Sequence, residues 1–306
     1  MDDHYIDIVR LLLDILPHVF TEGGFALKGG TAINLFLQNM PRMSVDIDLV
    51  YTGLEERDSA LQSIETKLNI IAKKLRDKLS LDVNLSSSGS ESETKLFIRK
   101  GKANIKVEVN HVFRRSVYPI VKGDLSKYAQ ERFSRSMAIQ MLDHDELYAS
   151  KLVAALDRQH PRDLFDVMLL FKKSSGLNPR MLRAFTVYLA GHNRPIHELL
   201  PPNEQDIHDI YKNEFLGMTT IADITVEQLE TVRTQLFSKF PSSLDDAERA
   251  FLLSIKRLKP DWEILGIPGI EELPAIRWKL HNIENLSRTN PTKYKKMLKA
   301  LEDKLS

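Results

Sequence analysis

Cysteine is missing altogether from the 306-residue chain. Its absence excludes disulfide bridges and thiolate metal sites, and it fits a protein of the reducing cytoplasm. Long apolar runs are missing as well, so no stretch of the sequence is predicted to span a membrane. The first residues, Met1-Asp2-Asp3, are unlike a signal peptide. Together these features predict a cytoplasmic protein with no membrane partner.

An excess of charge of one sign is also missing, because 43 Lys and Arg residues stand against 42 Asp and Glu residues and leave a net charge of +1. No global basic field therefore indicates a nucleic-acid partner, and any such surface must be local. Basic clusters occur at 99–102, at 114–115 and in the last helix. Such runs are usually solvated faces, but the first two could border a site for an RNA backbone. No segment resembles an RNA-reading module such as an RRM or a KH loop.

Hydrophobic residues make up 42% of the chain, enough to bury a substantial core. Apolar spacing predicts helices over 6–20 and 55–79 and strands over 81–85, 95–99 and 105–109. Beyond Asp143 the pattern is helical almost throughout. We therefore expect an α/β domain over 1–142 and an all-helical domain over 143–306.

A glycine pair supplies the first candidate site. A short apolar strand over 25–27 leads into Gly29-Gly30-Thr31, which opens an amphipathic helix. Backbone N–H groups at a helix N-terminus, with room for close approach, are suited to binding phosphate. The alternative is an ordinary turn in which Thr31 caps the helix that it opens.

Two acids follow in a second apolar segment. Alternate residues of a strand share a face, so Ser44, Asp46 and Asp48 are predicted to project to one side. Two neighbouring carboxylates repel each other unless a cation lies between them, and hard oxygen ligands suit Mg²⁺, which also binds substrate phosphates. A phosphate turn followed by metal-binding acids predicts a nucleotidyl-transfer site.

These residues resemble a known superfamily. The glycine turn followed by Arg42-Met43-Ser44-Val45-Asp46-Ile47-Asp48 is similar to the nucleotidyltransferases with a polymerase-β-like core. Two later blocks, KLVAALDR over 151–158 and PRDLFDV over 161–167, narrow the resemblance to the AbiEii/AbiGii-type toxins, which include the mycobacterial MenT toxins. PAIRWKL over 274–280 resembles the C-terminal region of that family, so the similarity spans most of the chain.

The resemblance implies a fold and a set of roles. The fold would be a polymerase-β-like α/β core with a mixed sheet, followed by a helical domain. Mg²⁺ would bind Asp46 and Asp48, and Lys151 and Asp163 would also be catalytic. The nucleotide would contact the residues of the first motif and one later acid, namely Gly29, Gly30, Thr31, Arg42, Ser44 and Asp166. From the residues alone, Asp163 in the first turn of a helix is also favoured by the helix dipole.

Glu108 is the candidate for a third acid. In the strand over 105–109, Lys106 and Glu108 are predicted to lie opposite the buried face. Nucleotidyltransferases commonly place an acid on such a neighbouring strand, where it acts as general base and helps to hold a metal. An ordinary amphipathic strand explains the pattern equally well, and both interpretations stay open.

The sequence therefore predicts a Mg²⁺-dependent nucleotidyltransferase toxin of a toxin–antitoxin or phage-defence system. By resemblance, it would transfer NMP from an NTP to an RNA, the 3′ end of tRNA, and block translation, with an antitoxin encoded nearby. Two alternatives are a small-molecule nucleotidyltransferase of the antibiotic-modifying kind and a catalytically weak nucleotide-binding regulator.

Overall fold

The structure is a computed structural model, and it describes residues 3–86, 93–173, 176–221 and 224–306. The chain forms two compact units, each described separately below. Unit 1 comprises 1–147 together with 218–221, and unit 2 comprises 148–217 together with 222–306. The predicted domain boundary after Leu142 stays a prediction.

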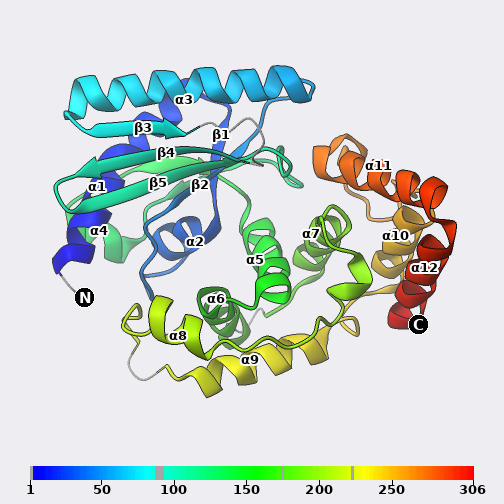
Figure 1. The fold of residues 1–306 in the computed structure, drawn as a ribbon. Coiled ribbons are helices and arrows are strands. Elements are labelled where there is room, and N and C mark those ends of the chain that lie inside the picture. The colour runs from blue at the N-terminus through cyan, green and yellow to red at the C-terminus, as the bar shows by residue number, and fades with distance from the viewer. Residues whose placement is uncertain (1–2, 87–92, 174–175, 222–223) are drawn as a thin grey trace. The chain divides into compact units, whose positions relative to one another are not determined.

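Unit 1 is built on a seven-stranded mixed sheet with the order β3-β4-β5-β2-β1-β7-β6. Figure 1 labels the first five strands of this order. The strands are β1 (Phe25–Lys28), β2 (Ile47–Tyr51), β3 (Asp82–Ser86), β4 (Glu93–Lys100), β5 (Ala103–Asn110), β6 (Val121–Asp124) and β7 (Ala138–Met141). Two pairs, β2 with β5 and β1 with β7, are parallel, and the others are antiparallel. The expected α/β fold with a mixed sheet is confirmed.

Two long helices, α1 (Asp3–Val19) and α3 (Arg57–Leu79), pack against the sheet through β3, β4 and β5 and against each other. Their apolar residues recur at helical spacing, and those of α3, Ile64, Leu68, Ile71 and Leu75, are fully buried. The strands alternate accordingly: Ile105, Val107 and Val109 are buried, and the residues between them are more exposed. The other face of these three strands therefore carries polar side chains.

The glycine pair stands where β1 ends. Gly29–Thr31 forms a single helical turn, α2, which continues as the π-helical turn η2 (Ala32–Leu37). The remaining helical elements of unit 1 are the 3-10 turn η1 (Phe20–Glu22), α4 (Lys127–Phe133) and the first turn of α5 (His144–Arg158).

The regular elements that the structure describes in unit 2 are all helices, as expected for the C-terminal part of the chain. After α5 come α6 (Pro161–Lys172), α7 (Pro179–Ala190), η3 (Ile196–Glu198), α8 (His208–Glu214), α9 (Val226–Lys239), α10 (Asp246–Lys256), η4 (Ile270–Glu272), α11 (Pro274–Thr289) and α12 (Pro291–Leu305). Aromatic pairs fill its core: the rings of Phe185 and Phe240 stack with centroids 4.4 Å apart.

Among the residues that the structure describes, no helix has the length and apolar character needed to cross a membrane.

Candidate active site

Gly29 and Gly30 pack directly against the acidic segment. Gly29 has φ = +73°, and a Cβ atom there would lie 3.0 Å from Cγ of Asp48. At Gly30 a Cβ would lie 2.7 Å from Nη2 of Arg42 and 2.9 Å from Oγ of Ser44. A side chain at either position would therefore force Asp48, Arg42 or Ser44 to move, and at Gly29 the positive φ disfavours a side chain as well.

Thr31 connects the turn to the segment that precedes β2. Its Oγ1 lies 3.1 Å from Oγ of Ser44 and donates a 2.5 Å hydrogen bond to the carbonyl oxygen of Asp46. Thr31 is fully buried, and the residue in the N-cap position of the helical turn is Lys28. The Tyr5 hydroxyl of α1 accepts a hydrogen bond from the Ser44 N–H at 3.2 Å. Two side chains thus fix the backbone beside Asp46.

Arg42 is buried at the same turn, with 3% of its surface exposed. Its backbone N–H donates to Oδ1 of Asn34 at 3.3 Å, and Nδ2 of Asn34 donates to the carbonyl oxygen of Gly30 at 2.9 Å. Nη1 of Arg42 donates to the carbonyl oxygen of Met43 at 2.7 Å. Arg42 therefore brings a positive charge next to Gly30.

The two acids occupy different backbone environments. The sequence predicted both within one strand, but β2 begins at Ile47, so Asp46 precedes the strand and Asp48 lies inside it. Asp48 stands opposite Lys28 of β1 and beside Glu108 of β5 in the register of the sheet. Because residues in register share a face, Asp48 and Glu108 project to the same side.

Glu108 makes ion pairs with two lysines. Its Oε1 lies 3.2 Å from Nζ of Lys95 and 3.1 Å from Nζ of Lys106. The hydrogen bond to Glu108, followed by that to Glu93, raises the pKa of the Lys95 ammonium. The carboxylate of Glu108 is thus placed beside Asp48 while its charge is balanced by lysines.

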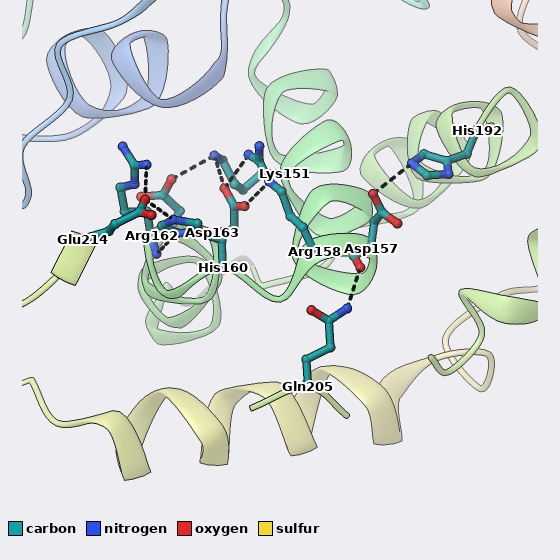
Figure 2. A network of polar contacts seen from close by, with 10 residues as sticks. Lys151, Asp157, Arg158, His160, Arg162, Asp163, His192, Gln205 and Glu214 are labelled. Carbon is teal, nitrogen blue, oxygen red and sulfur yellow. Dashed lines mark hydrogen bonds and ion pairs between the residues drawn. The ribbon is translucent and has the colours of Figure 1, made fainter. Parts of the chain in front are cut away.

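The later motifs meet in unit 2, where Figure 2 shows their polar contacts. Nζ of Lys151 on α5 lies 2.7 Å from Oδ1 of Asp163 and 3.2 Å from Oδ2 of Asp166, both on α6. Nε of Arg158 binds Oδ2 of Asp163 at 2.7 Å. The Lys151, Asp163 and Asp166 side chains are 7%, 2% and 1% exposed, whereas that of Arg158 is 61% exposed. Arg158 is therefore the member of this group that reaches solvent.

Burial alone raises the pKa of the Asp163 carboxyl, but the charges of Lys151 and Arg158 and their hydrogen bonds outweigh burial and hold that pKa far below its usual range. Asp163 is therefore ionised at neutral pH.

His160 secures the start of α6. Its Nδ1 accepts a hydrogen bond from the Arg162 N–H at 3.1 Å, so its other ring nitrogen, Nε2, carries the proton that is shared with Oε2 of Glu214 at 3.0 Å. The same Glu214 oxygen accepts from Nη2 of Arg162 at 3.3 Å (Figure 2). These contacts fix the helix turn that carries Asp163.

Residues 10–282 match the family of AbiEii nucleotidyl transferase toxins of type IV toxin–antitoxin systems. The chain belongs to this family. AbiEii membership makes it a nucleotidyltransferase toxin, and it implies an NTP substrate and a cognate antitoxin. No curated protein matches the sequence.

The AbiEii chain also resembles a solved structure, that of the nucleotidyltransferase toxin MenT4 from Mycobacterium tuberculosis H37Rv. The TM-score is 0.58 at 15% sequence identity, over 90% of this chain and 93% of MenT4. At this identity the likeness shows the fold, and it agrees with the nucleotidyltransferase core expected from the sequence.

The donor set of this AbiEii chain fits a divalent cation. Across the described part of the chain, no cluster of three or more His, Cys, Asp or Glu side chains could hold a metal by itself. Mg²⁺, however, is commonly bound by one or two carboxylates together with water and substrate phosphates. Asp46 and Asp48 carry hard oxygen ligands of that kind, and Asp48 lies against Gly29.

Several residues around the candidate site do not stand out in the sequence. Lys28 stands in register with Asp48, Tyr5 holds the Ser44 backbone, and Lys95 pairs with Glu108. Lys28 could have been found because it directly precedes the glycine pair. The contacts of Tyr5 and Lys95 depend on tertiary packing and strand register, for which the sequence carries no local signal.

Proposed function

We propose that this toxin transfers NMP from an NTP to an RNA acceptor, the 3′ end of tRNA, with Mg²⁺ as the metal. Pyrophosphate would leave, the modified tRNA would no longer support translation, and growth would stop. The proposal includes a cytoplasmic site of action and a role in phage defence.

One observation supports the proposal above all: the glycine turn lies against the carboxylate of Asp48 without room for a side chain. A phosphate bound at the N–H groups of that turn would therefore lie beside the acids that hold the metal. Arg42 and Ser44, which flank Gly30, would bind further phosphate oxygens. Thr31 would act by positioning Ser44 and Asp46, because its hydroxyl is buried and bonded to both.

A metal bound at Asp46 and Asp48 would neutralise the charge that develops on the α-phosphate and on the leaving pyrophosphate. The protein itself binds the triphosphate, orients it, and supplies fixed positive charge. These contributions are of the electrostatic kind that typically accounts for most of the rate enhancement in phosphoryl and nucleotidyl transfer.

From unit 2 we propose Lys151 as a phosphate-binding residue and Asp163 as the acid that positions it. Both of the Lys151 contacts are to carboxylates, so its ammonium group is held in one place. Asp166 would support the same lysine and contact the nucleotide. The exposed guanidinium of Arg158, anchored by Asp163, would add a second positive charge.

Glu108 is kept as the proposed third acid because it lies in register with Asp48. In that role it would accept the proton of the attacking hydroxyl, and it would have to release at least one of its two lysine partners. Because this release would limit what Glu108 contributes, we expect Glu108→Gln to reduce transfer less than the loss of Asp46 or Asp48 does.

The test is a transfer assay with each α-³²P-labelled NTP and total tRNA, run with Asp46→Asn and Asp48→Asn. Each substitution keeps the shape of the side chain and removes its charge, and transfer should fall by at least about 100-fold. Asp77→Asn makes the same chemical change at an exposed position of α3 and should leave transfer unchanged.

The proposal is supported if the wild type labels tRNA and if this label disappears in both Asp46→Asn and Asp48→Asn. Undiminished transfer by either variant contradicts the assigned mechanism. Label in a small molecule, with none in RNA, would indicate that the acceptor is an antibiotic-like compound and not RNA. No transfer to any acceptor would indicate a nucleotide-binding regulator.

A further inference from the structure

Phe97 is a large aromatic side chain on the polar face of the sheet, 47% exposed. Its neighbours along β4, Leu96 and Ile98, are buried beneath it. A single exposed aromatic residue is ordinary on a protein surface. The groups that surround Phe97 make it informative.

Phe97 is bordered by cations on three sides. In the register of the sheet it stands opposite Lys106 of β5 and Asn84 of β3. Lys95 and Arg99, two residues away along β4, share its face. An aromatic ring is thus framed by Lys95, Arg99 and Lys106, with an amide side chain on the fourth side.

Phe97 also lines a groove that reaches the proposed metal site. The groove has a volume of about 320 Å³, and the residues that border it include Asp46, Asp82, Asn84, Phe97, Arg99 and Lys106. The lining of this groove therefore includes both an acid proposed to bind the metal and the exposed ring. The acidic charge of Glu108 on this face is balanced by Lys95 and Lys106.

The order of the strands gives this groove a direction. The acids lie at β2, the glycine turn follows β1 on one side of it, and β5, β4 and β3 extend on the other side. In nucleotidyl transfer the attacking and leaving oxygens lie roughly in line on opposite sides of the phosphorus. A triphosphate on the β1 side would leave the β5 side open to the attacking hydroxyl, and the groove lies over β5, β4 and β3.

We propose that this groove binds the single-stranded end of the RNA acceptor, with one base stacked on the Phe97 ring. Arg99 and Lys106 contact the backbone phosphates, and Asn84 is placed to hydrogen-bond the edge of the stacked base. Aromatic stacking and cationic side chains along the backbone are the means by which proteins hold single strands with little sequence preference. The inference rests on the proposed function, because it names where that acceptor binds.

The experiment measures transfer kinetics, with RNA and NTP varied separately, for Phe97→Ala, Phe97→Leu and Phe97→Trp. Loss of the ring in the Ala and Leu variants should raise the KM for RNA roughly 5- to 100-fold, as for other stacked bases. The KM for NTP should stay unchanged, and the Trp variant should restore RNA binding. Tyr128→Ala removes an aromatic ring of similar exposure, 42%, from α4 and should change neither constant.

Binding without chemistry provides the second measurement. Fluorescence anisotropy with a labelled single-stranded RNA should show weaker binding by Phe97→Ala, and Arg99→Gln should reduce the slope of log K against log salt by about 1. Thermal melting of each variant shows whether it is folded, and the Leu variant keeps an apolar side chain if Ala disturbs the strand.

The outcomes separate the two proposals. If the wild type labels RNA and the KM for RNA is the same in Phe97→Ala and Phe97→Leu, the groove assignment is wrong and the proposed function stands. A rise in the KM for NTP alone would assign the groove to the nucleotide base and overturn the inference. If the wild type labels no RNA, the proposed function fails, and equal RNA binding by wild type and Phe97→Ala then rejects the groove as well.

Discussion

Lys151 and Asp163 form a buried ion pair of 2.7 Å that joins α5 to α6. Asp166 shares the same ammonium group at 3.2 Å, so one lysine balances part of the charge of two carboxylates that are almost inaccessible to solvent. Removing Lys151 would take away the charge that Asp163 and Asp166 share and would leave Asp163 with the pairing to Arg158. Lys151 therefore matters for the stability of unit 2, whatever else it does.

We expect Lys151→Ala to lower the free energy of unfolding by about 3–5 kcal/mol, the typical cost of removing one partner of a buried pair. Urea unfolding followed by circular dichroism measures the change. Lys172→Ala, at an exposed position near the end of α6, serves as the matched control and should cost little. A Lys151→Ala protein as stable as the wild type would show that the buried carboxylates are compensated in another way.

Loss of transfer in a Lys151 variant has to be separated from unfolding. Lys151→Arg keeps a positive charge, although the planar guanidinium cannot reproduce both contacts of the ammonium group. We expect this variant to stay folded at the assay temperature and to lose transfer. Full activity of a folded Lys151→Arg enzyme would argue against a specific role of the ammonium group in binding phosphate.

The second prediction concerns Gly29. Gly29→Ala places a Cβ against the Asp48 carboxylate at a backbone angle that already disfavours side chains. We expect loss of nucleotidyl transfer and a stability cost above the ~1 kcal/mol typical of a strained turn. The cost arises because either the turn or Asp48 must move.

Gly101 supplies the control for backbone strain. It also has positive φ, +60°, but a Cβ there would meet nothing within 4 Å. Gly101→Ala should therefore lose only the stability that corresponds to backbone strain, as measured by urea unfolding, and should keep its activity in the transfer assay. If Gly29→Ala and Gly101→Ala lost the same stability and activity, the packing of Gly29 against Asp48 would not contribute to function.

The sequence predicts the elements of unit 1 well where a single periodicity dominates. The buried stripe of α3 and the alternation of buried and more exposed residues in β5 each follow from a pattern within one segment, and both were predicted. The strands β6 and β7 were not, because each spans four residues and pairs mainly with the other. Short strands acquire their structure from their neighbours rather than from a local pattern.

The candidate site divides in the same way. Asp46 and Asp48 could be chosen from spacing because carboxylates stand out in an apolar segment. The ion pair of Lys95 with Glu108 could not be predicted, since it depends on the register that sets Lys95 opposite Glu108. The contact of Lys151 with Asp163 depends on the packing of α5 against α6, which no periodicity within either helix encodes.

The third prediction tests the positioning role of Thr31. Thr31→Ser keeps the hydroxyl that bonds to the carbonyl oxygen of Asp46, whereas Thr31→Val replaces it with a methyl group of similar size. We expect the Val variant to lose transfer at least 10-fold and the Ser variant to retain most of it, because small displacements of reacting groups are costly. Comparing kcat at saturating NTP measures the effect. Similar activity in both variants would assign the contact to folding alone.

The last prediction is a pH dependence of stability that originates at Lys279 of α11. This residue is 7% exposed, and its Nζ donates 2.6 Å hydrogen bonds to the carbonyl oxygens of His192 and Arg194. Burial, together with the nearby charge of Lys256 on α10, lowers the pKa of Lys279 from 10.5 to about 8, while Glu198 of η3 opposes the shift. The charged form therefore costs free energy in the folded protein.

Between pH 8 and 10.5 the unfolded chain holds the Lys279 proton that the folded protein has released, so the free energy of unfolding should rise with pH across this window. The full shift corresponds to roughly 3 kcal/mol as an upper limit. Lys279→Met cannot titrate at this position. From pH 8 to 10.5 the wild type should therefore gain stability relative to the variant, as measured by urea unfolding of both. Lys299→Met, which removes an exposed lysine from α12, corrects for the loss of one charge. A difference independent of pH would show that Lys279 keeps its proton in the folded state, with the carbonyl oxygens of His192 and Arg194 offsetting the cost of burial.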